Sequence, residues 1–232
     1  MLYLNYSKNS TKRLAMRKIK FQTDHYYHVF NRGVDKRNIF LDKNDYTRFI
    51  RSMHSFNQLK PTRSLYFLDN LKRQKGTESL NFRDSVPLIE IITYCLIPNH
   101  YHFLLKQITD GGVSEFIKRI ATGYTTYFNQ KNKRSGVLFQ GPFKAVEIRS
   151  DGQLQKISCY INGNSEIHNI TKATSWTWSS YMDYLNLRKG NLCNKNIILD
   201  QFKNIEEYKN LTTTIINDSK QQKEEIKNFL LE

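Results

Sequence analysis

The segment Pro98-Asn99-His100-Tyr101-His102-Phe103-Leu104-Leu105 follows one expected β-strand and continues into the next. Residues 88–97 form an apolar run typical of a buried strand, and residues 101–107 are expected to form the next strand. Side chains alternate along a strand, so His100 and His102 would project from one face. Two imidazoles on one face can hold a divalent metal and leave positions open for a substrate. On spacing alone, however, two such histidines are more often a satisfied or half-exposed pair than a metal site.

The charge of the chain is its clearest compositional signal. The chain has 232 residues and a net charge of +15, with 39% hydrophobic and 13% aromatic residues, which is enough for a packed core. The first 200 residues carry 31 Lys and Arg against 15 acids, whereas the remainder carries five Lys against six acids. A basic body indicates a polyanionic partner, most often nucleic acid, although a solvated basic surface has the same composition.

Cysteine usage and hydropathy indicate the compartment. Cys95, Cys159 and Cys193 are too few and too scattered for a disulfide framework or a zinc ribbon, and they favour a reducing environment. No apolar run is long enough to span a membrane, and the start of the chain does not read as a signal peptide. The expected location is therefore the cytoplasm, with no membrane partner.

The order of the expected elements predicts the fold. Asp42 is expected to cap a helix of about 15 residues, and Ser114 is expected to cap a second helix. Strands are expected at 22–33, 88–97, 101–107 and 143–149. The first helix, from 42, follows the first strand, and the second helix, at 114–130, follows the third strand. This order matches the split βαβ, ferredoxin-like arrangement, an α+β fold. We expect an antiparallel sheet with both helices on one face and the imidazoles on the other face or at an edge.

The chain divides into a core and flanking segments. Residues 1–20 carry six basic residues and no acid, which fits either a DNA-contacting arm or an over-extended start preceding Met16. The main domain is expected at 21–184, with a polar surface insertion at 60–87 and a helical appendage at 185–232. The aromatic segment 176–181 is expected to pack back on the domain.

A third amphipathic helix is expected at about 151–163. Leu154, Ile157 and Ile161 form its apolar stripe, and Tyr160 lies off the centre of that stripe. Asn164 follows Tyr160 by four residues and would lie on the same face.

The ordered set of motifs resembles the REP-associated branch of the HUH-type single-tyrosine transposases. The resemblance covers residues 22–184 and is carried by Tyr27-His28-Val29-Phe30-Asn31-Arg32-Gly33, Pro98-Asn99-His100-Tyr101-His102, Asn129, Gly136-Val137-Leu138-Phe139-Gln140, Tyr160-Ile161-Asn162-Gly163-Asn164 and Trp178-Ser179-Ser180-Tyr181. The family usually has Asn-Pro where this chain has Asn164-Ser165, and Gly163 stands inside the last helical turn.

The resemblance implies an enzyme that nicks and joins DNA. Tyr160 would attack single-stranded or hairpin, repeat-associated DNA, giving a 5′-phosphotyrosine and a free 3′-hydroxyl. His100 and His102 would hold Mg²⁺ or Mn²⁺, and the Asn164 amide would complete the metal site. A homodimer is compatible with the resemblance, so Tyr160 could serve its own metal site or that of a partner subunit.

Each assignment has a plainer alternative. Tyr124 and Tyr127 are rival tyrosines, but both lie on a core stripe, and Asn164 could instead end its helix in the left-handed conformation. His25, His28, His54 and His168 are taken as structural or surface residues. A cluster of basic residues is expected to contact phosphates: Arg32, Lys118, Arg119, Arg134, Lys144 and Arg149.

Two other functions remain open. The protein could be a basic ferredoxin-like module that binds nucleic acid without cutting it, or a nuclease that activates water on a metal and forms no covalent intermediate.

Overall fold

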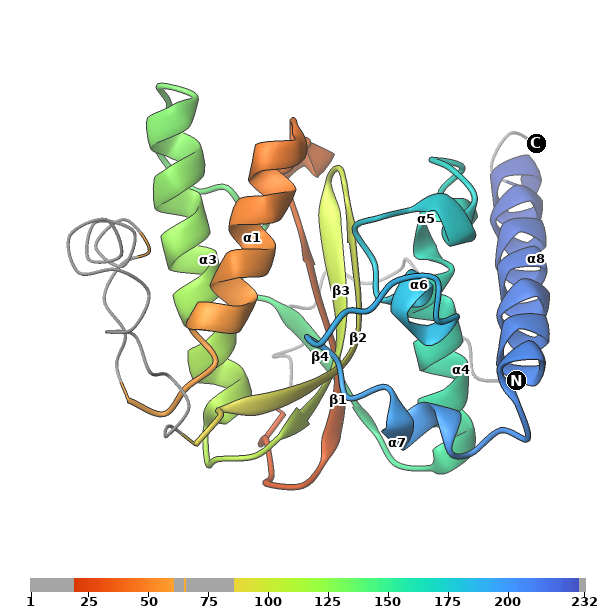
Figure 1. Ribbon diagram of the computed structural model, residues 1–232. Helices are drawn as coiled ribbons and strands as arrows, with labels where there is room; N and C mark the ends of the chain where they lie inside the picture. Colours follow the sequence, from red (N-terminus) through yellow and green to blue (C-terminus); the bar gives the residue numbers. More distant parts are fainter. Residues whose placement is uncertain (1–18, 61–64, 66–85, 230–232) are drawn as a thin grey trace.

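A four-stranded antiparallel sheet of order β2-β3-β1-β4 forms the centre of the molecule (Figure 1). The computed structural model describes residues 19–60, 65 and 86–229. The strands are β1 (Tyr26–Arg32), β2 (Ile89–Ile97), β3 (His100–Gln107) and β4 (Lys144–Ile148). The first and third strands lie in the middle, as expected, and the α+β fold is confirmed.

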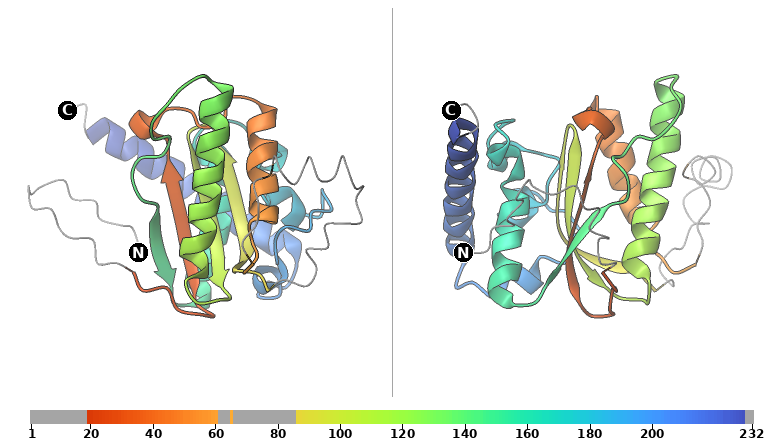
Figure 2. Two further views of the ribbon diagram at one scale, coloured as in Figure 1. Left: turned by 90° about the vertical axis from the view of Figure 1, so that its left-hand side faces the viewer. Right: turned by 180° about the vertical axis from the view of Figure 1, so that it is seen from behind.

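Helices cover both faces of this sheet (Figures 1 and 2). One face carries α1 (Lys43–Ser55) and α3 (Gly112–Lys131), which is the predicted pair. The other face carries α4 (Asp151–Asn162), α5 (Asn164–Ile167), α6 (Tyr181–Tyr184), α7 (Asn196–Leu199) and α8 (Ile205–Phe229). Among the described residues, the short 3-10 turns η1 (Val34–Lys36) and η4 (Ala173–Ser175) lie in the connections.

Strand alternation separates two hydrophobic cores. On β3, Tyr101, Phe103 and Leu105 point to the core under α1 and α3, whereas Leu104 points to the core under α4. His100 and His102 therefore lie on the same side as Leu104. The alternation of side chains on β3 therefore places the imidazoles on the face away from α1 and α3, as predicted.

Side-chain caps set the starts of α1 and α4. The Asp42 carboxylate accepts from the backbone N–H groups of Asn44 (2.9 Å) and Asp45 (3.2 Å), so it caps α1 as predicted. The prediction that Ser114 caps the second helix is wrong. Gly111 is the cap, because its left-handed backbone (φ 66°) turns the chain into α3 two residues earlier, and Ser114 falls inside the first turn.

The first strand also starts later than its sequence pattern suggests. Asp24 has a left-handed backbone (φ 65°), so the chain turns before β1 begins at Tyr26. Backbone hydrogen bonds still join this turn to the end of β3, through Asp24 N–H to the Gln107 carbonyl at 2.8 Å.

The aromatic segment 176–181 packs back on the domain as expected, along the outer edge of β2. The Leu96 N–H donates to the Trp178 carbonyl at 2.9 Å, and the Ser180 N–H donates to the Tyr94 carbonyl at 3.0 Å. The Trp176 indole donates to the Leu96 carbonyl at 2.9 Å. Strand β4 forms the opposite edge of the sheet.

Helix α8 lies against the outer side of α4 and α5 (Figure 1). It supplies Tyr208 and Ile216 to the core under α4, so this part of segment 185–232 takes part in the packing of that core. The N-terminal arm and most of the expected insertion lie outside the described residues. Among the helices that the structure does describe, none combines the length and apolarity needed to cross a bilayer.

A buried hydroxyl joins α8 to α4. The Tyr208 hydroxyl bonds Ser158 Oγ at 2.8 Å and accepts from the Asn162 amide at 2.8 Å. Tyr208→Phe leaves these buried groups without that partner, so the free energy of unfolding should fall by about 1–3 kcal/mol. Urea denaturation measures this loss. Thr214→Ala, which removes an exposed hydroxyl from the same helix, is the control and should change stability by less than about 0.5 kcal/mol.

Candidate active site

Two imidazoles project from β3 at the end of the sheet nearest the turn that precedes it. The His100 and His102 rings lie 5.0 Å apart between centroids and are nearly perpendicular. His102 is buried and His100 is half-buried. The alternation of β3 places both rings beneath α4 and α5, on the side of the second core.

Two further histidines, taken as structural or surface residues from the sequence, complete a cluster of four. His28 Nε2 lies 2.9 Å from His102 Nδ1, and the His168 ring lies 4.7 Å from the His100 ring. The position of His28 follows from the sheet topology. Strand β1 pairs with β3, and His28 shares a face of β1 with Tyr26 and Phe30. No local signal points to His168, which follows the short helix α5.

Hydrogen bonds determine which nitrogen of His100 carries the proton. The Asn99 amide donates to the Lys36 carbonyl at 3.2 Å, so Asn99 Oδ1 faces His100 Nδ1, at 2.7 Å. An amide oxygen only accepts, so Nδ1 bears the hydrogen and Nε2 keeps its lone pair. His102 Nδ1 is engaged with His28 Nε2. The Nε2 atom of His102 takes no part in that hydrogen bond.

Burial keeps all four imidazoles neutral at physiological pH. It lowers the pKa of His28 and of His168 to about 4 each. It lowers the pKa of His100 to about 3, with a further contribution from neighbouring His168, and it holds the pKa of His102 well below its ordinary value. Neutral imidazole is the form that binds metal ions.

Tyr160 approaches this cluster from α4. Its ring makes edge-to-face contacts with His102, at 5.9 Å between centroids, and with His28, at 6.3 Å. Ser150 caps the helix by accepting from the Gln153 N–H at 3.3 Å, and Leu154 and Ile161 bury its inner face. The structure thus brings Tyr160 beside the imidazoles of its own chain.

The chain breaks its helix between Tyr160 and Asn164. Helix α4 ends at Asn162, and Gly163 (φ −79°) joins it to α5. A Cβ atom at Gly163 would lie 2.6 Å from Ile216 Cγ1 on α8, so this close approach requires glycine. Asn164 is the first residue of α5. The alternative that Asn164 ends its helix in the left-handed conformation is therefore wrong. That conformation occurs at Asn169 (φ 55°) instead.

The Asn164 side chain is fully buried, and neither its amide nitrogen nor its amide oxygen has a hydrogen-bond partner among the described residues. It lies close enough to His100 to raise that residue's pKa against the larger effect of burial, but without the geometry of a hydrogen bond. Neighbouring Asn162 is fully paired, with Tyr208 at 2.8 Å and Ser180 at 2.7 Å. Buried unpaired amides are costly, so Asn164 fits a group that awaits a ligand.

The donor set fits a divalent cation that takes nitrogen and oxygen ligands. Within the described ranges, no group of three or more His, Cys, Asp or Glu side chains is arranged to hold a metal ion. The candidate ligands here are two imidazole nitrogens and one amide oxygen. The third would come from an asparagine, which is not one of those four residue types. Such a set leaves coordination positions open for phosphate oxygens.

The six basic residues expected to contact phosphates do not form one cluster. Arg32 pairs with His100 across the β1–β3 ladder and hydrogen-bonds Gln140. Lys118 and Arg119 lie on α3, on the far face of the sheet from the imidazoles. Arg119 is also engaged by Glu115 at 2.8 Å and by the Gln58 carbonyl at 2.6 Å.

The other three basic residues have separate places. Arg134 holds the turn after α3, by donating to Asn129 Oδ1 at 2.6 Å and to the Val137 carbonyl at 2.9 Å. Lys144 is exposed at the start of β4. Arg149 is largely exposed and bonds Glu147 at 2.9 Å.

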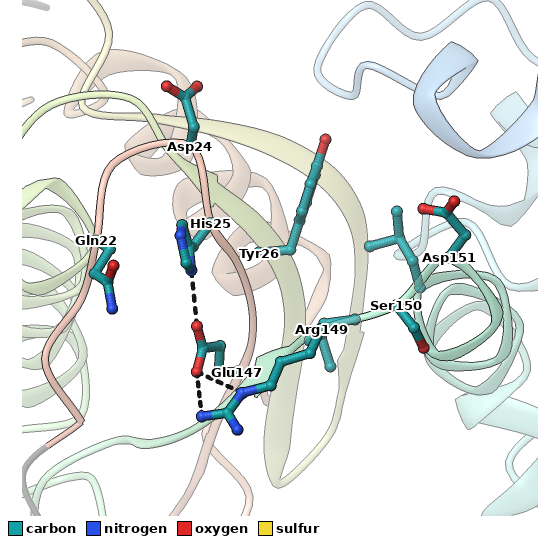
Figure 3. Close-up of a pocket in the computed structure, with 10 residues that line it drawn as sticks. Gln22, Asp24, His25, Tyr26, Glu147, Arg149, Ser150 and Asp151 are labelled. Carbon is teal, nitrogen blue, oxygen red and sulfur yellow. Dashed lines mark hydrogen bonds and ion pairs between the residues drawn. The ribbon is translucent and has the colours of Figure 1, made fainter.

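Arg149 also lines an open pocket of about 440 Å³ beside the start of α4 (Figure 3). His25 and Arg149 both bond Glu147 in this pocket, and Asp24 and Asp151 lie at its sides. Three carboxylates against one guanidinium make a poor phosphate site. Neither Tyr160 nor the four-histidine cluster lines it.

Comparison with known proteins finds one family model that is similar to part of the chain. Residues 83–164 match the family model described as "Transposase IS200 like", a range that includes His100, His102, Tyr160 and Asn164. A solved REP-associated tyrosine transposase bound to a REP hairpin is similar at 14% identity, covering 72% of this chain and 82% of that chain, with a TM-score of 0.46.

A candidate transposase from Deinococcus radiodurans R1 is similar at 12% identity, covering 68% of this chain and 99% of that chain, with a TM-score of 0.33. No curated protein matches the sequence.

Proposed function

We propose, on the premise that residues 83–164 match the IS200-like transposase family model, that this chain nicks and rejoins DNA through Tyr160 with the help of a divalent metal. The observation that carries the proposal is the contact of the Tyr160 ring with His102, at 5.9 Å, within one chain. A phenol beside neutral imidazoles and an unpaired amide is what such chemistry needs.

The residues that would hold Mg²⁺ or Mn²⁺ are His100, His102 and Asn164. When bound, the metal would stabilise negative charge on the phosphate oxygens. Asn99 orients His100, and His28 orients His102, by engaging the Nδ1 atom of each ring. Partners of this kind fix the tautomer of a metal-binding histidine.

Tyr160 would act as the nucleophile. Its oxygen forms a bond to phosphorus as the bond from phosphorus to the 3′-oxygen breaks, so the phenol loses a proton and the 3′-oxygen gains one. Phenol has a pKa near 10 and is a weak nucleophile at neutral pH, so positioning beside the phosphate has to supply much of the rate. The phosphotyrosine retains the bond energy, so a second 3′-hydroxyl can reverse the step and join strands.

The proposed substrate is single-stranded or hairpin DNA, in keeping with the repeat-associated branch that the sequence motifs resemble. A single chain contains the whole arrangement, so the proposal requires no second subunit. Of the basic residues expected at the DNA, Arg32 is the best placed, because its charge lies near enough to lower the pKa of His100.

The test is a covalent-trapping assay. Labelled single-stranded DNA that carries repeat hairpins is incubated with the protein and Mn²⁺, and the products are separated under denaturing conditions. We expect a labelled protein–DNA adduct and a free 3′-hydroxyl on the released strand. Cleavage without an adduct would indicate a water nucleophile, and binding without cleavage would favour the non-cutting DNA-binding module.

DNA binding should depend steeply on salt, because each phosphate contact releases counterions. About four contacts to a single strand would weaken binding roughly 50-fold between about 50 and about 200 mM monovalent salt. Fluorescence anisotropy of labelled DNA without metal measures this slope. A flat response would show that the basic body, with its excess of Lys and Arg, is not the binding surface.

A further inference from the structure

Lys223 on α8 lies beside the histidine cluster. Its ammonium donates to the Ile167 carbonyl at 3.2 Å, and within the described part of the chain no carboxylate pairs with it. Lys220, one turn earlier on the same helix, forms an ion pair with Glu166 at 3.5 Å. Lys223 is exposed as a whole residue, but desolvation of its ammonium lowers its pKa.

The position of this ammonium is set by α5. Ile167 is the last residue of α5 and precedes His168, whose ring lies 4.7 Å from that of His100. The charge of Lys223 contributes to the lowered pKa of His100, His102 and His168, so it acts on three of the four imidazoles.

We propose that Lys223 contacts a phosphate oxygen of the DNA strand bound at the candidate active site and stabilises the negative charge that develops there. This inference rests on the proposed function, because it assumes that the strand enters beside His100 and Tyr160. Neutral imidazoles supply no negative charge to a cation held next to them. A phosphate would supply the missing counter-charge.

A structural role for the same residue gives different expectations. Lys223 could serve only to bond the last carbonyl of α5. In that case its loss would loosen the packing of α5 on α8, and the thermal unfolding midpoint would fall. DNA affinity at different salt concentrations would then keep its slope.

The experiment compares Lys223→Gln with Lys209→Gln. Both variants remove one positive charge from α8, but Lys209 pairs with Glu206 at 3.1 Å, near the start of the helix. Three quantities are measured on the full chain: the salt dependence of binding to single-stranded DNA, the rate of adduct formation at saturating DNA and Mn²⁺, and the thermal midpoint.

For Lys223→Gln we expect the log–log salt slope to become shallower by about 0.7, which corresponds to one phosphate contact. Adduct formation should slow at least tenfold, and Lys223→Arg should restore much of it. The thermal midpoint should match that of Lys209→Gln, whose slope and rate should match the wild type.

An unchanged salt slope for Lys223→Gln would overturn the phosphate contact. A lowered thermal midpoint, with DNA binding and the rate of adduct formation reduced by the same factor, would also overturn it. A shallower slope with a normal adduct rate overturns the stabilising role. If the wild-type protein binds DNA but forms no adduct, the proposed function fails, and the slope still decides whether Lys223 contacts the strand.

Discussion

Tyr160→Phe is expected to eliminate the covalent protein–DNA adduct while leaving DNA affinity within about threefold of the wild type. The substitution removes one oxygen and keeps the ring that packs against His102 and His28. Without a phenolic oxygen no bond to phosphorus can form, so the loss should exceed about a thousandfold in rate. Denaturing gels of labelled DNA incubated with Mn²⁺ measure the adduct, and anisotropy measures binding.

Tyr127→Phe is the matched control. Tyr127 is also partly buried on a helix, but it lies on α3 across the sheet and donates to Asp45 at 3.0 Å. This variant should form the adduct at the wild-type rate per folded molecule. An adduct that persists in Tyr160→Phe would assign the nucleophile to another residue, which peptide mapping of the adduct would identify.

Asn164→Leu is expected to have opposite effects on metal binding and on folding. Removing the amide oxygen should weaken Mn²⁺ binding by at least about tenfold, and adduct formation should fall with it. The metal-free protein, however, should become more stable by about 1–3 kcal/mol, because a fully buried amide without partners is replaced by an apolar side chain of similar size. Calorimetric titration and urea denaturation in chelator measure the two quantities.

Asn162→Leu provides the control for this prediction. Asn162 is equally buried, but its amide bonds Tyr208 and Ser180, so its replacement should destabilise the fold. If both variants lose stability alike, Asn164 has a structural hydrogen-bonding role. If Mn²⁺ binds Asn164→Leu as tightly as the wild type, the amide is not a ligand.

Much of the fold could be predicted because its signals are local and periodic. Alternation on β3 placed His100 and His102 on one face, and the order of elements placed that strand in the middle of the sheet. Helical spacing likewise separated Tyr160 from the core stripe of α4, and the structure puts its ring against His102.

The rest depends on contacts between distant segments. His28 reaches His102 only because β1 and β3 pair, and His168 reaches His100 only because the chain breaks at Gly163. Gly163 also lies close against Ile216 of α8, a contact that no local pattern reveals. Charge patterns also carry no information about sheet faces, so they do not separate Lys118 and Arg119 from Arg32, although α3 lies on the other side of the sheet.

The coverage of the sheet edges has a consequence for self-association. Segment 176–181 hydrogen-bonds the outer edge of β2 at Tyr94 and Leu96, and the Asn194 N–H bonds the Ile91 carbonyl, so β4 is the more open edge among the described strands. That strand has five residues and carries Lys144 and Glu147, and short charged edges resist strand addition. Aggregation by intermolecular β-pairing is therefore disfavoured at both margins of the sheet.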